Sequence, residues 1–288
     1  MLASRGSGVL VKVPIGVGSP GVLRPVISSA LMRIGVIGAG NMAAALVRGL
    51  GEPVLVADPV AERAASLAAE TGGEALEANA YVADRADVVV LCHKPAQLEE
   101  VAEGLAGRAR VVVSLLGGRS LFDLERAYPG IPVYRFMPNV AAEVGRAVLC
   151  YAPGSRAPEG PEAEVLELFG RVGTVVAVPE AQMEVATALA GCAPAFHALV
   201  VEALVDAGVG HGLAPEDATR MAVGAMAGTA ALMDEGGLDP KEVRRRVTSP
   251  GGSTARGLVA LERGGLRAAF QDAVDAVVRG GAPPAGRP

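Results

Sequence analysis

Two stretches of this sequence have glycines spaced as in loops that bind the pyrophosphate of a dinucleotide. The first, GVGSPG (16–21), is followed by Pro25 and by no helical pattern. The second, GAGNMA (38–43), follows a short apolar run and opens an amphipathic stretch, and Asp58 lies twenty residues after its first glycine. In a dinucleotide-binding βαβ unit the glycines allow a tight turn and a close backbone approach, and the pyrophosphate lies at the helix N-terminus. We therefore predict a dinucleotide site at the second motif and none at the first.

Asp58 and Arg63 bear on which dinucleotide this site prefers. An acidic residue at the end of the second strand accepts hydrogen bonds from the hydroxyls of an adenosine ribose, which favours NADH. Arg63, which follows within the same stretch DPVAER (58–63), would instead suit the 2′-phosphate of NADPH. Asp58 is also consistent with a solvated residue at a strand end. The sequence therefore leaves the choice between NADH and NADPH open.

Polar residues follow two further predicted strands. LCHKP (91–95) ends an apolar run at the carboxyl side of the predicted sheet, where open α/β sheets bind their ligands. His93 and Lys94 are therefore candidate cofactor neighbours, although solvated side chains would have the same spacing. Asn139, in RFMPNV (135–140), either lines a cleft or forms the turn.

The stretch TSPGGST (248–254) interrupts a region that otherwise has a helical pattern. Pro250 restricts this loop, its two glycines leave backbone N–H groups uncovered, and Ser253 or Thr254 opens the next helix. Uncovered N–H groups at a helix N-terminus bind a carboxylate well, and a hydroxyl would lie beside that anion. The same pattern is typical of an ordinary helix cap after a glycine turn. From these residues alone, both interpretations stand.

The elements that must position these motifs fall into two halves. From 33 to about 179, short apolar runs alternate with amphipathic stretches, which predicts parallel strands covered on both faces by helices. The apolar runs are 33–38, 54–58, 87–92, 110–115, 132–137, 147–151 and 174–178, and the helical stretches include 41–50, 60–71 and 96–107. The fold class predicted for this half is an α/β Rossmann-type doubly wound sheet.

The second half is predicted to be all-α. Helical patterns cover 194–213, 216–235 and, as two helices, 256–280. The middle pattern is apolar nearly all round, so its helix needs neighbours on several sides, and we expect an oligomer interface here. The predicted domains are an N-terminal extension (1–31) that is disordered or precedes a true start at Met32, a Rossmann dinucleotide-binding domain (32–179), an all-α substrate and dimerisation domain (180–280) and a flexible tail (281–288).

Composition argues against several other classes of function. The net charge of −5 gives no electrostatic reason to expect nucleic acid or an acidic membrane as partner. The three cysteines and three histidines lie far apart, so we expect no disulfide framework and no metal site, in a reduced, cytoplasmic protein. The apolar stretch 185–201 contains Gly191 and Pro194 and is short for a membrane span, so it is predicted to be a buried helix.

Five stretches together resemble pyrroline-5-carboxylate reductase, and the resemblance runs from about Arg33 to Arg279. They are IGVIGAGNMA (34–43), CHKPAQ (92–97), RFMPN (135–139), EALVDAGVGHGL (202–213) and, most specifically, VTSPGGSTARGLVALERGGLRAAF (247–270). The resemblance implies a reduction of 1-pyrroline-5-carboxylate, a cyclic imino acid, to L-proline with NADPH or NADH, the last step of proline biosynthesis. It also implies a homodimer through the C-terminal helices, which in this family often assembles further into a decamer.

Together with the strand-end reasoning, the resemblance assigns residues to the two ligands. Those expected at the cofactor are Ile37, Gly38, Ala39, Gly40, Asn41, Met42, Asp58, Asn79, Cys92, His93, Lys94, Pro95, Leu115, Leu116, Gly117 and Asn139. Those expected at the substrate carboxylate are Ser249, Gly251, Gly252, Ser253 and Thr254. Hydride attack on C=N needs a protonated nitrogen, and the hydroxyl of Thr254, expected beside that nitrogen, is the candidate catalytic group.

The sequence also departs from the family pattern near the expected cleft. SGSGPAY appears as AGCAPAF (190–196), MPNTP appears as MPNVA (137–141), and the turn usually written V-K-P has His93. Two alternatives therefore remain: a paralogue that reduces another cyclic imino acid, and a non-catalytic nucleotide-binding sensor or assembly protein. A β-hydroxyacid dehydrogenase would need a catalytic lysine in the second half, where nothing marks Lys241 as catalytic. The intact SPGGST motif (249–254) favours the reductase.

Overall fold

The computed structural model describes residues 32–279, so the predictions for 1–31 and 281–288 lie outside the described residues. The chain divides into two compact units, the first ending at Cys192 and the second beginning at Ala193. The sequence places this boundary at 179/180, where the strand pattern stops. In the structure, Met183, Ala186 and Ala190 form a core cluster with residues of the sheet, which joins this segment to the first unit.

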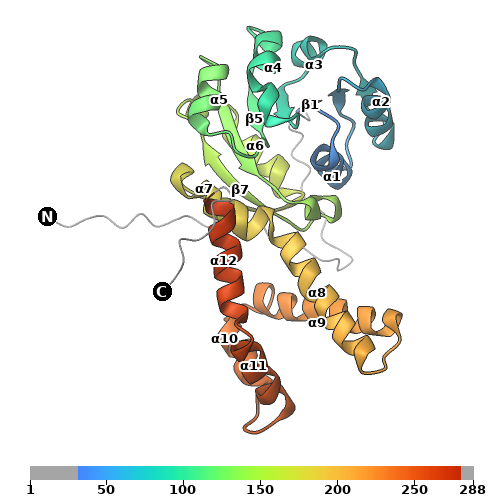
Figure 1. Ribbon diagram of the computed structural model, residues 1–288. Helices are drawn as coiled ribbons and strands as arrows, with labels where there is room; N and C mark the ends of the chain where they lie inside the picture. Colours follow the sequence, from blue (N-terminus) through green and yellow to red (C-terminus); the bar gives the residue numbers. More distant parts are fainter. Residues whose placement is uncertain (1–31, 280–288) are drawn as a thin grey trace, which may run out of the picture. The chain divides into compact units, whose positions relative to one another are not determined.

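One eight-stranded sheet, in the order β3-β2-β1-β4-β5-β6-β7-β8, forms the centre of the first unit (Figure 1). The strands are β1 (Ile34–Ile37), β2 (Leu55–Ala57), β3 (Glu74–Ala75), β4 (Val88–Leu91), β5 (Val112–Ser114), β6 (Val133–Met137), β7 (Ala147–Pro153) and β8 (Gly173–Ala177). Neighbouring strands run parallel except β6 and β7. The first six strands have the order of dinucleotide-binding folds, which confirms the predicted Rossmann-type class.

Helices cover both faces of this sheet. On one face, α1 (Asn41–Leu50), α2 (Ala61–Glu70) and α6 (Glu162–Gly170) share a core cluster with Tyr134 and Phe136 of β6. On the other face, α3 (Asn79–Arg85), α4 (Leu98–Leu105) and α5 (Leu121–Ala127) share a cluster with Val133 of the same strand. Successive residues of β6 thus serve opposite cores, as the two-residue period of a strand requires. Shorter helical segments are η1 (Pro95–Gln97), η2 (Val140–Val144), η3 (Ala157–Glu159), η4 (Glu180–Gln182), α7 (Met183–Ala186) and η5 (Thr187–Gly191), a π-helix.

Two features of the sheet differ from the sequence-based expectation. The strand β3 was not predicted, because its two residues are too few to show a strand pattern. The strand β7 was expected to be parallel, but it pairs antiparallel with β6, with Phe136 opposite Tyr151. Only residues 138–146 join these two strands, and a parallel crossover needs a dozen or more residues. The short connection therefore decides the direction of β7.

The second unit is all-α, as predicted. It contains α8 (Ala193–Gly210), α9 (Pro215–Asp234), α10 (Pro240–Arg246), α11 (Ser253–Arg263) and α12 (Leu266–Val278). The prediction that 185–201 is a buried helix is wrong for α8, which has no buried residue and leaves Leu199 64% exposed. An apolar pattern indicates that a helix needs a covering surface, and the described residues do not supply one for α8. Within residues 32–279, the helical stretch Glu180–Gly210 is long and apolar enough to cross a membrane by length and composition alone.

Phe136→Ala should lower the free energy of unfolding by about 3–5 kcal/mol. Its ring is fully buried and lies 4.4 Å from the ring of Phe169 and 4.8 Å from that of Tyr151, centroid to centroid. Urea denaturation followed by far-UV circular dichroism measures the loss. Phe122 is 71% exposed, so Phe122→Ala is a matched control that should cost less than about 1 kcal/mol. Equal losses in the two variants would contradict the described core.

Candidate functional site

The glycine-rich loop follows β1 and leads directly into α1. Gly38 has a φ of 96°, a conformation that glycine tolerates and other residues rarely adopt. A Cβ atom added to Gly38 would lie 2.6 Å from the backbone nitrogen of His93, so the loops after β1 and β4 touch backbone to backbone. A Cβ on Gly40, by contrast, would meet no atom within 4 Å. The space above Gly40 is therefore open to a ligand.

The N-terminus of α1 is suited to an anion. Gly40 is its N-cap residue, no side chain caps the helix, and its first turn contains no acidic residue. The first N–H groups of a helix have no carbonyl partner within it, and the helix dipole adds a partial positive charge. Asn41 is exposed at this end and Met42 is half-buried behind it. The arrangement fits the pyrophosphate expected at this motif.

Asp58 joins this loop to the start of α2. Its Oδ2 accepts a hydrogen bond from the backbone N–H of Ala39 at 2.7 Å, and its Oδ1 accepts one from the N–H of Val60 at 2.8 Å. Each carboxylate oxygen has a second lone pair, so these bonds leave Asp58 able to accept from a ribose as well. Arg63 lies exposed in the first turn of α2. The sequence found the position of Asp58 but not its bond to the glycine-rich loop.

The turn after β4 lies against the glycine-rich loop. The backbone N–H of Cys92 donates to the carbonyl of Ile37 at 2.8 Å. Burial raises the pKa of the Cys92 thiol to about 12, so this cysteine stays protonated and is no nucleophile. Burial also lowers the pKa of His93, whose Nδ1 lies 2.9 Å from the carbonyl oxygen of Lys94. His93 is therefore a neutral side chain fixed by its own turn, while Lys94 and Pro95 are exposed.

The remaining predicted cofactor residues of the sheet edge contribute in different ways. Leu115 and Leu116, after β5, are buried, whereas Gly117 is exposed, so the accessible surface here is backbone near Gly117. Asn79 is half-buried and begins α3, which follows β3. The loops after β2, β1, β4 and β5 follow four adjacent parallel strands. They therefore form one continuous ligand-facing edge at the carboxyl ends, where this fold class binds dinucleotides.

Asn139 differs from the other predicted cofactor residues, because its side chain is already hydrogen-bonded within the protein. It is 8% exposed, its Oδ1 accepts from the N–H of Ala141 at 3.2 Å, and its Nδ2 donates to the carbonyl of Ala190 at 3.0 Å. Ala190 belongs to the π-helix η5, a rare form that is often found at functional sites. The structure thus gives Asn139 a bond that holds η5 to β6.

Arg135 is a buried residue that the sequence analysis did not single out. Its Nη1 lies 2.5 Å from Oε1 of Glu180, and its Nη2 lies 3.5 Å from Oε1 of Glu184. The same Oε1 of Glu180 accepts the backbone N–H of Leu121 at 3.0 Å. This ion pair fastens the segment that begins at η4 to β6 and α5. A lone arginine in the strand pattern VYRFM (133–137) is the signal that could have revealed it.

The loop between α10 and α11 and the first turn of α11 together carry all five predicted substrate residues. Gly251 has a φ of 69°, and Gly252 donates its N–H to the carbonyl of Ser249 at 3.1 Å. Gly252 is the N-cap of α11, no side chain caps it, and the first turn has no acidic residue. Ser253 and Thr254 are exposed in that turn. The geometry provides uncovered N–H groups with a hydroxyl beside them, which suits a carboxylate.

The loop is closely packed within itself. A Cβ on Gly252 would lie 2.5 Å from Oγ of Ser249, so glycine is needed for the serine hydroxyl to fold over the loop. The guanidinium of Arg256 donates to the carbonyl of Gly251 at 2.7 Å, which fixes the glycine turn from the next helical turn. In residues 32–279 no cluster of histidine, cysteine and carboxylate side chains could hold a metal ion.

Comparisons with known proteins agree in both halves of the chain. Residues 33–118 match the family described as NADP oxidoreductase, coenzyme F420-dependent, and residues 180–282 match the family described as pyrroline-5-carboxylate reductase dimerisation. A pyrroline-5-carboxylate reductase of Mycobacterium tuberculosis is 39% identical over 279 residues, covering 85% of this chain and 94% of the relative. One of Synechocystis is 35% identical over 257 residues, covering 86% of this chain and 96% of the relative.

Solved structures show the same similarity. The 1-pyrroline-5-carboxylate reductase of Streptococcus pyogenes matches with a TM-score of 0.80 and 28% identity, over 87% of this chain and 98% of that one. The pyrroline carboxylate reductase of Plasmodium falciparum, solved with NADP bound, matches with a TM-score of 0.77 and 25% identity, over 87% of this chain and 97% of that one.

Gly38→Ala and Gly40→Ala should separate folding from dinucleotide binding. At Gly38 the added methyl group collides with the backbone of His93, so the midpoint of thermal unfolding should fall. At Gly40 the methyl group meets nothing in the protein but occupies the pyrophosphate space, so dinucleotide affinity should fall by about tenfold or more at unchanged thermal stability. Thermal melts and NADH fluorescence titrations measure the two effects. Undiminished affinity in Gly40→Ala would remove the pyrophosphate from this loop.

Proposed function

Because this chain belongs to the pyrroline-5-carboxylate reductase family, we propose that it reduces 1-pyrroline-5-carboxylate to L-proline with NADPH or NADH. One observation carries the proposal: the intact loop TSPGGST (248–254) leads into an uncapped, exposed first turn of α11. A nucleotide-binding half without this loop would fit many dehydrogenases. A loop of this kind in the same chain adds a place for the carboxylate of a small imino acid.

The cofactor is assigned to the carboxyl edge of the sheet. In this proposal the pyrophosphate lies at the loop 37–42, and the adenosine half lies toward Asp58 and Asn79. The nicotinamide half lies along the turn 92–95 and the backbone of 115–117. The hydride comes from the reduced nicotinamide when it is bound, and the protein supplies position. Asn139 is not assigned a cofactor contact, because its side chain is bonded to Ala190 and Ala141.

The substrate carboxylate is assigned to the loop before α11. Ser249 and the backbone N–H groups of 252–254 bind the two carboxylate oxygens, which fixes the ring relative to the cofactor. The hydroxyl of Thr254 lies by the imine nitrogen. That nitrogen must hold its proton while the neighbouring carbon accepts a hydride, and the hydroxyl can bond the nitrogen or donate to it. The thiol of Cys92 is assigned no role as nucleophile or base, because burial keeps it protonated.

The match to the dimerisation family covers residues 180–282 and so includes all the described residues of the second unit. We extend this to a homodimer in which a second copy covers the apolar residues of α8 and α9, among them Leu199, Leu204 and Met221, which are 64%, 54% and 59% exposed. Such exposure is unusual for a surface that stays in water. The proposal includes further assembly of dimers into a decamer and a cytoplasmic location, with no nucleic acid or membrane as partner. The described cysteines Cys92, Cys150 and Cys192 are all free thiols, which fits a reducing compartment.

The decisive experiment follows oxidation of NADH and NADPH by the purified protein with pyrroline-5-carboxylate. Turnover with this substrate above that with a piperideine carboxylate supports the proposal. The departure AGCAPAF (190–196) makes the six-membered ring the relevant competitor, because Cys192 and Phe196 replace the usual serine and tyrosine. Preference for the larger ring would mean a paralogue. Cofactor binding without turnover of either substrate would mean a sensor.

Thr254→Ala should lower kcat by about 100-fold or more and leave dinucleotide affinity nearly unchanged. The hydroxyl is assigned to the reacting nitrogen, and no cofactor contact is assigned to it. Steady-state kinetics and NADH titrations measure the two quantities. Thr254→Ser keeps the hydroxyl and should recover most of the lost turnover. Near-normal kcat in the alanine variant would take Thr254 out of the reaction.

Asp58→Ala should raise KM for NADH more than KM for NADPH. The carboxylate can bind the free ribose hydroxyls of NADH, whereas it repels the 2′-phosphate of NADPH. Part of any loss comes from the broken bond to Ala39, and that part affects both cofactors equally. The ratio of the two KM values therefore isolates the ribose contact. An unchanged ratio would refute it.

A further inference from the structure

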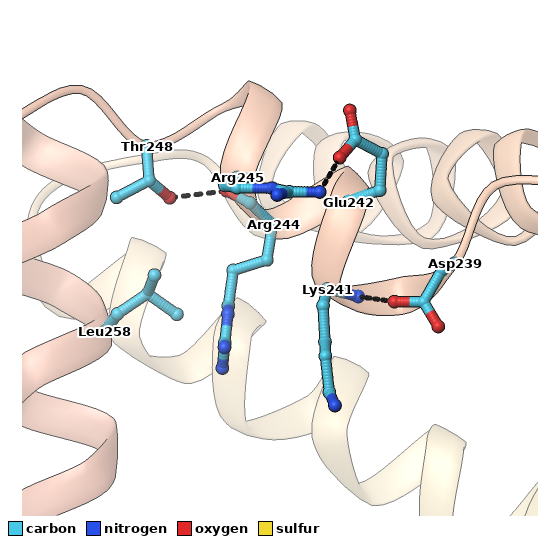
Figure 2. Close-up of a pocket in the computed structure, with 7 residues that line it drawn as sticks. All are labelled: Asp239, Lys241, Glu242, Arg244, Arg245, Thr248 and Leu258. Atoms are coloured by element: carbon cyan, nitrogen blue, oxygen red, sulfur yellow. Dashed lines mark hydrogen bonds and ion pairs between the residues drawn. The ribbon is translucent and has the colours of Figure 1, made fainter.

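A hollow of about 520 Å³ lies in the second unit, beside the loop assigned to the substrate. It is lined by Asp239, Lys241, Glu242, Arg244, Arg245, Thr248 and Leu258, which come from α10, the segments that flank it and α11 (Figure 2). No residue of the hollow has a role in the proposed reaction. Figure 2 shows the side chains of Lys241 and Arg244 extending from α10 in parallel.

The carboxylates at this hollow are already used within the same short helix. Oδ1 of Asp239 accepts the backbone N–H of Lys241 at 2.7 Å and so caps α10. Glu242 bonds to the guanidinium groups of Arg245 and Arg246, and these bonds, that of Arg246 first, hold the pKa of Glu242 below its usual range. Glu242 therefore remains ionised and neutralises the arginines on its own side of the helix.

Two further cations of α10, Lys241 and Arg244, have no such partner among the described residues. Lys241 and Arg244 are three residues apart and so share one face of the helix. No hydrogen bond or ion pair joins the ammonium of Lys241 or the guanidinium of Arg244 to another side chain within 32–279. Glu262 is close enough to Arg244 for an electrostatic attraction. However, both carboxylate oxygens of Glu262 already accept hydrogen bonds from Nε of Arg267, at 2.9 Å each.

The local charge is opposite in sign to that of the whole chain. Residues 239–267 contain seven lysines and arginines against three carboxylates, whereas the full sequence has a net charge of −5. An ammonium and a guanidinium side by side, next to an apolar wall at Leu258, form a surface for a phosphate group with room for a small organic body.

We propose that Lys241 and Arg244 bind a phosphate group in this hollow, at a site separate from the substrate and cofactor loops. The ligand is inorganic phosphate or a small phosphate ester whose body packs on Leu258. Binding restrains α10 and, with it, the loop that follows. An effect of this restraint on catalysis rests on the role proposed above for residues 249–254. Phosphate binding in the hollow does not depend on that role.

Thr248 is the link between the hollow and the loop. Its hydroxyl donates to the carbonyl of Arg244 at 2.6 Å, and its N–H donates to the carbonyl of Arg245 at 3.2 Å. Ser249 follows directly, and its carbonyl accepts the N–H of Gly252 at 3.1 Å. Three consecutive hydrogen bonds thus connect the last turn of α10 to the N-cap of α11. An anion that fixes Arg244 therefore reduces the motion of the loop.

Isothermal titration calorimetry of phosphate into the full-length protein tests the site. Saturating NADH and L-proline are present, so that the glycine-rich loop and the 249–254 loop are occupied and cannot account for the heat. We expect saturable binding that weakens by about tenfold or more in the double variant Lys241→Met/Arg244→Met. The site is identified by the difference between the variants, which needs neither turnover nor proline binding, so the result does not depend on whether the proposed reaction is correct.

The matched control is Arg246→Met/Arg263→Met, which removes the same charge from two exposed arginines that do not line the hollow. Arg246 is already paired with Glu242, so phosphate affinity should change by less than about twofold. Equal weakening by both double variants would mean nonspecific attraction to a basic surface, and no saturable binding in the unmodified protein would mean that the hollow is not a site. Either result overturns the proposal.

The same titration with AMP distinguishes the two sources of phosphate. Tighter binding of AMP than of phosphate, lost in Lys241→Met/Arg244→Met, identifies a phosphate ester; equal affinities identify the ion alone. The rate of backbone hydrogen exchange in residues 247–254 then measures how far phosphate restrains this loop. Phosphate should slow exchange in the unmodified protein and not in the double variant, and unchanged exchange at saturating phosphate would overturn the link through Thr248.

Discussion

The backbone contact between the loops that follow β1 and β4 is the constraint on which the cofactor edge depends. Gly38 lies so close to Cys92 and His93 that no side chain fits between them. The same two loops are joined by the hydrogen bond from Cys92 to Ile37, and Gly38 donates to Ala57 of β2. Three strand ends are thus held as one rigid unit. The anion-binding turn and the 92–95 turn cannot move independently.

Both candidate ligand loops use the same physical device. The helices α1 and α11 each begin after an extended glycine N-cap with no acidic side chain in the first turn, whereas α12, which also lacks an acidic first turn, begins after a left-handed glycine. The helices α2, α4, α6 and α9 each carry a glutamate or aspartate there. A carboxylate in the first turn satisfies the helix dipole from within the protein. Its absence at α1 and α11 leaves that positive end for a bound anion.

Local sequence patterns predicted the helices and turns whose limits depend on residues close together in the chain. The bounds of α1 matched the prediction, and those of α9 came within one residue of it, because apolar periodicity and flanking glycine or proline residues define them. The patterns that flank 38–43, rather than its glycine spacing, predicted a strand before it and a helix after it, and the structure has both. Asn139 and Arg135 could not be understood in the same way. Their partners Ala190 and Glu180 lie 51 and 45 residues further along the chain, and no short-range pattern reports such contacts.

Because α8 has an exposed apolar surface, the stability of the second unit should depend on protein concentration. A helix without a single buried residue gains little free energy from burial within its own chain, so in the proposed homodimer much of its stabilisation comes from association. Ordering of α8 and pairing of copies then form one mass-action equilibrium, whose thermal midpoint rises with concentration. Dilution by itself would loosen this half of the molecule and leave the eight-stranded sheet, which has its own cores, intact.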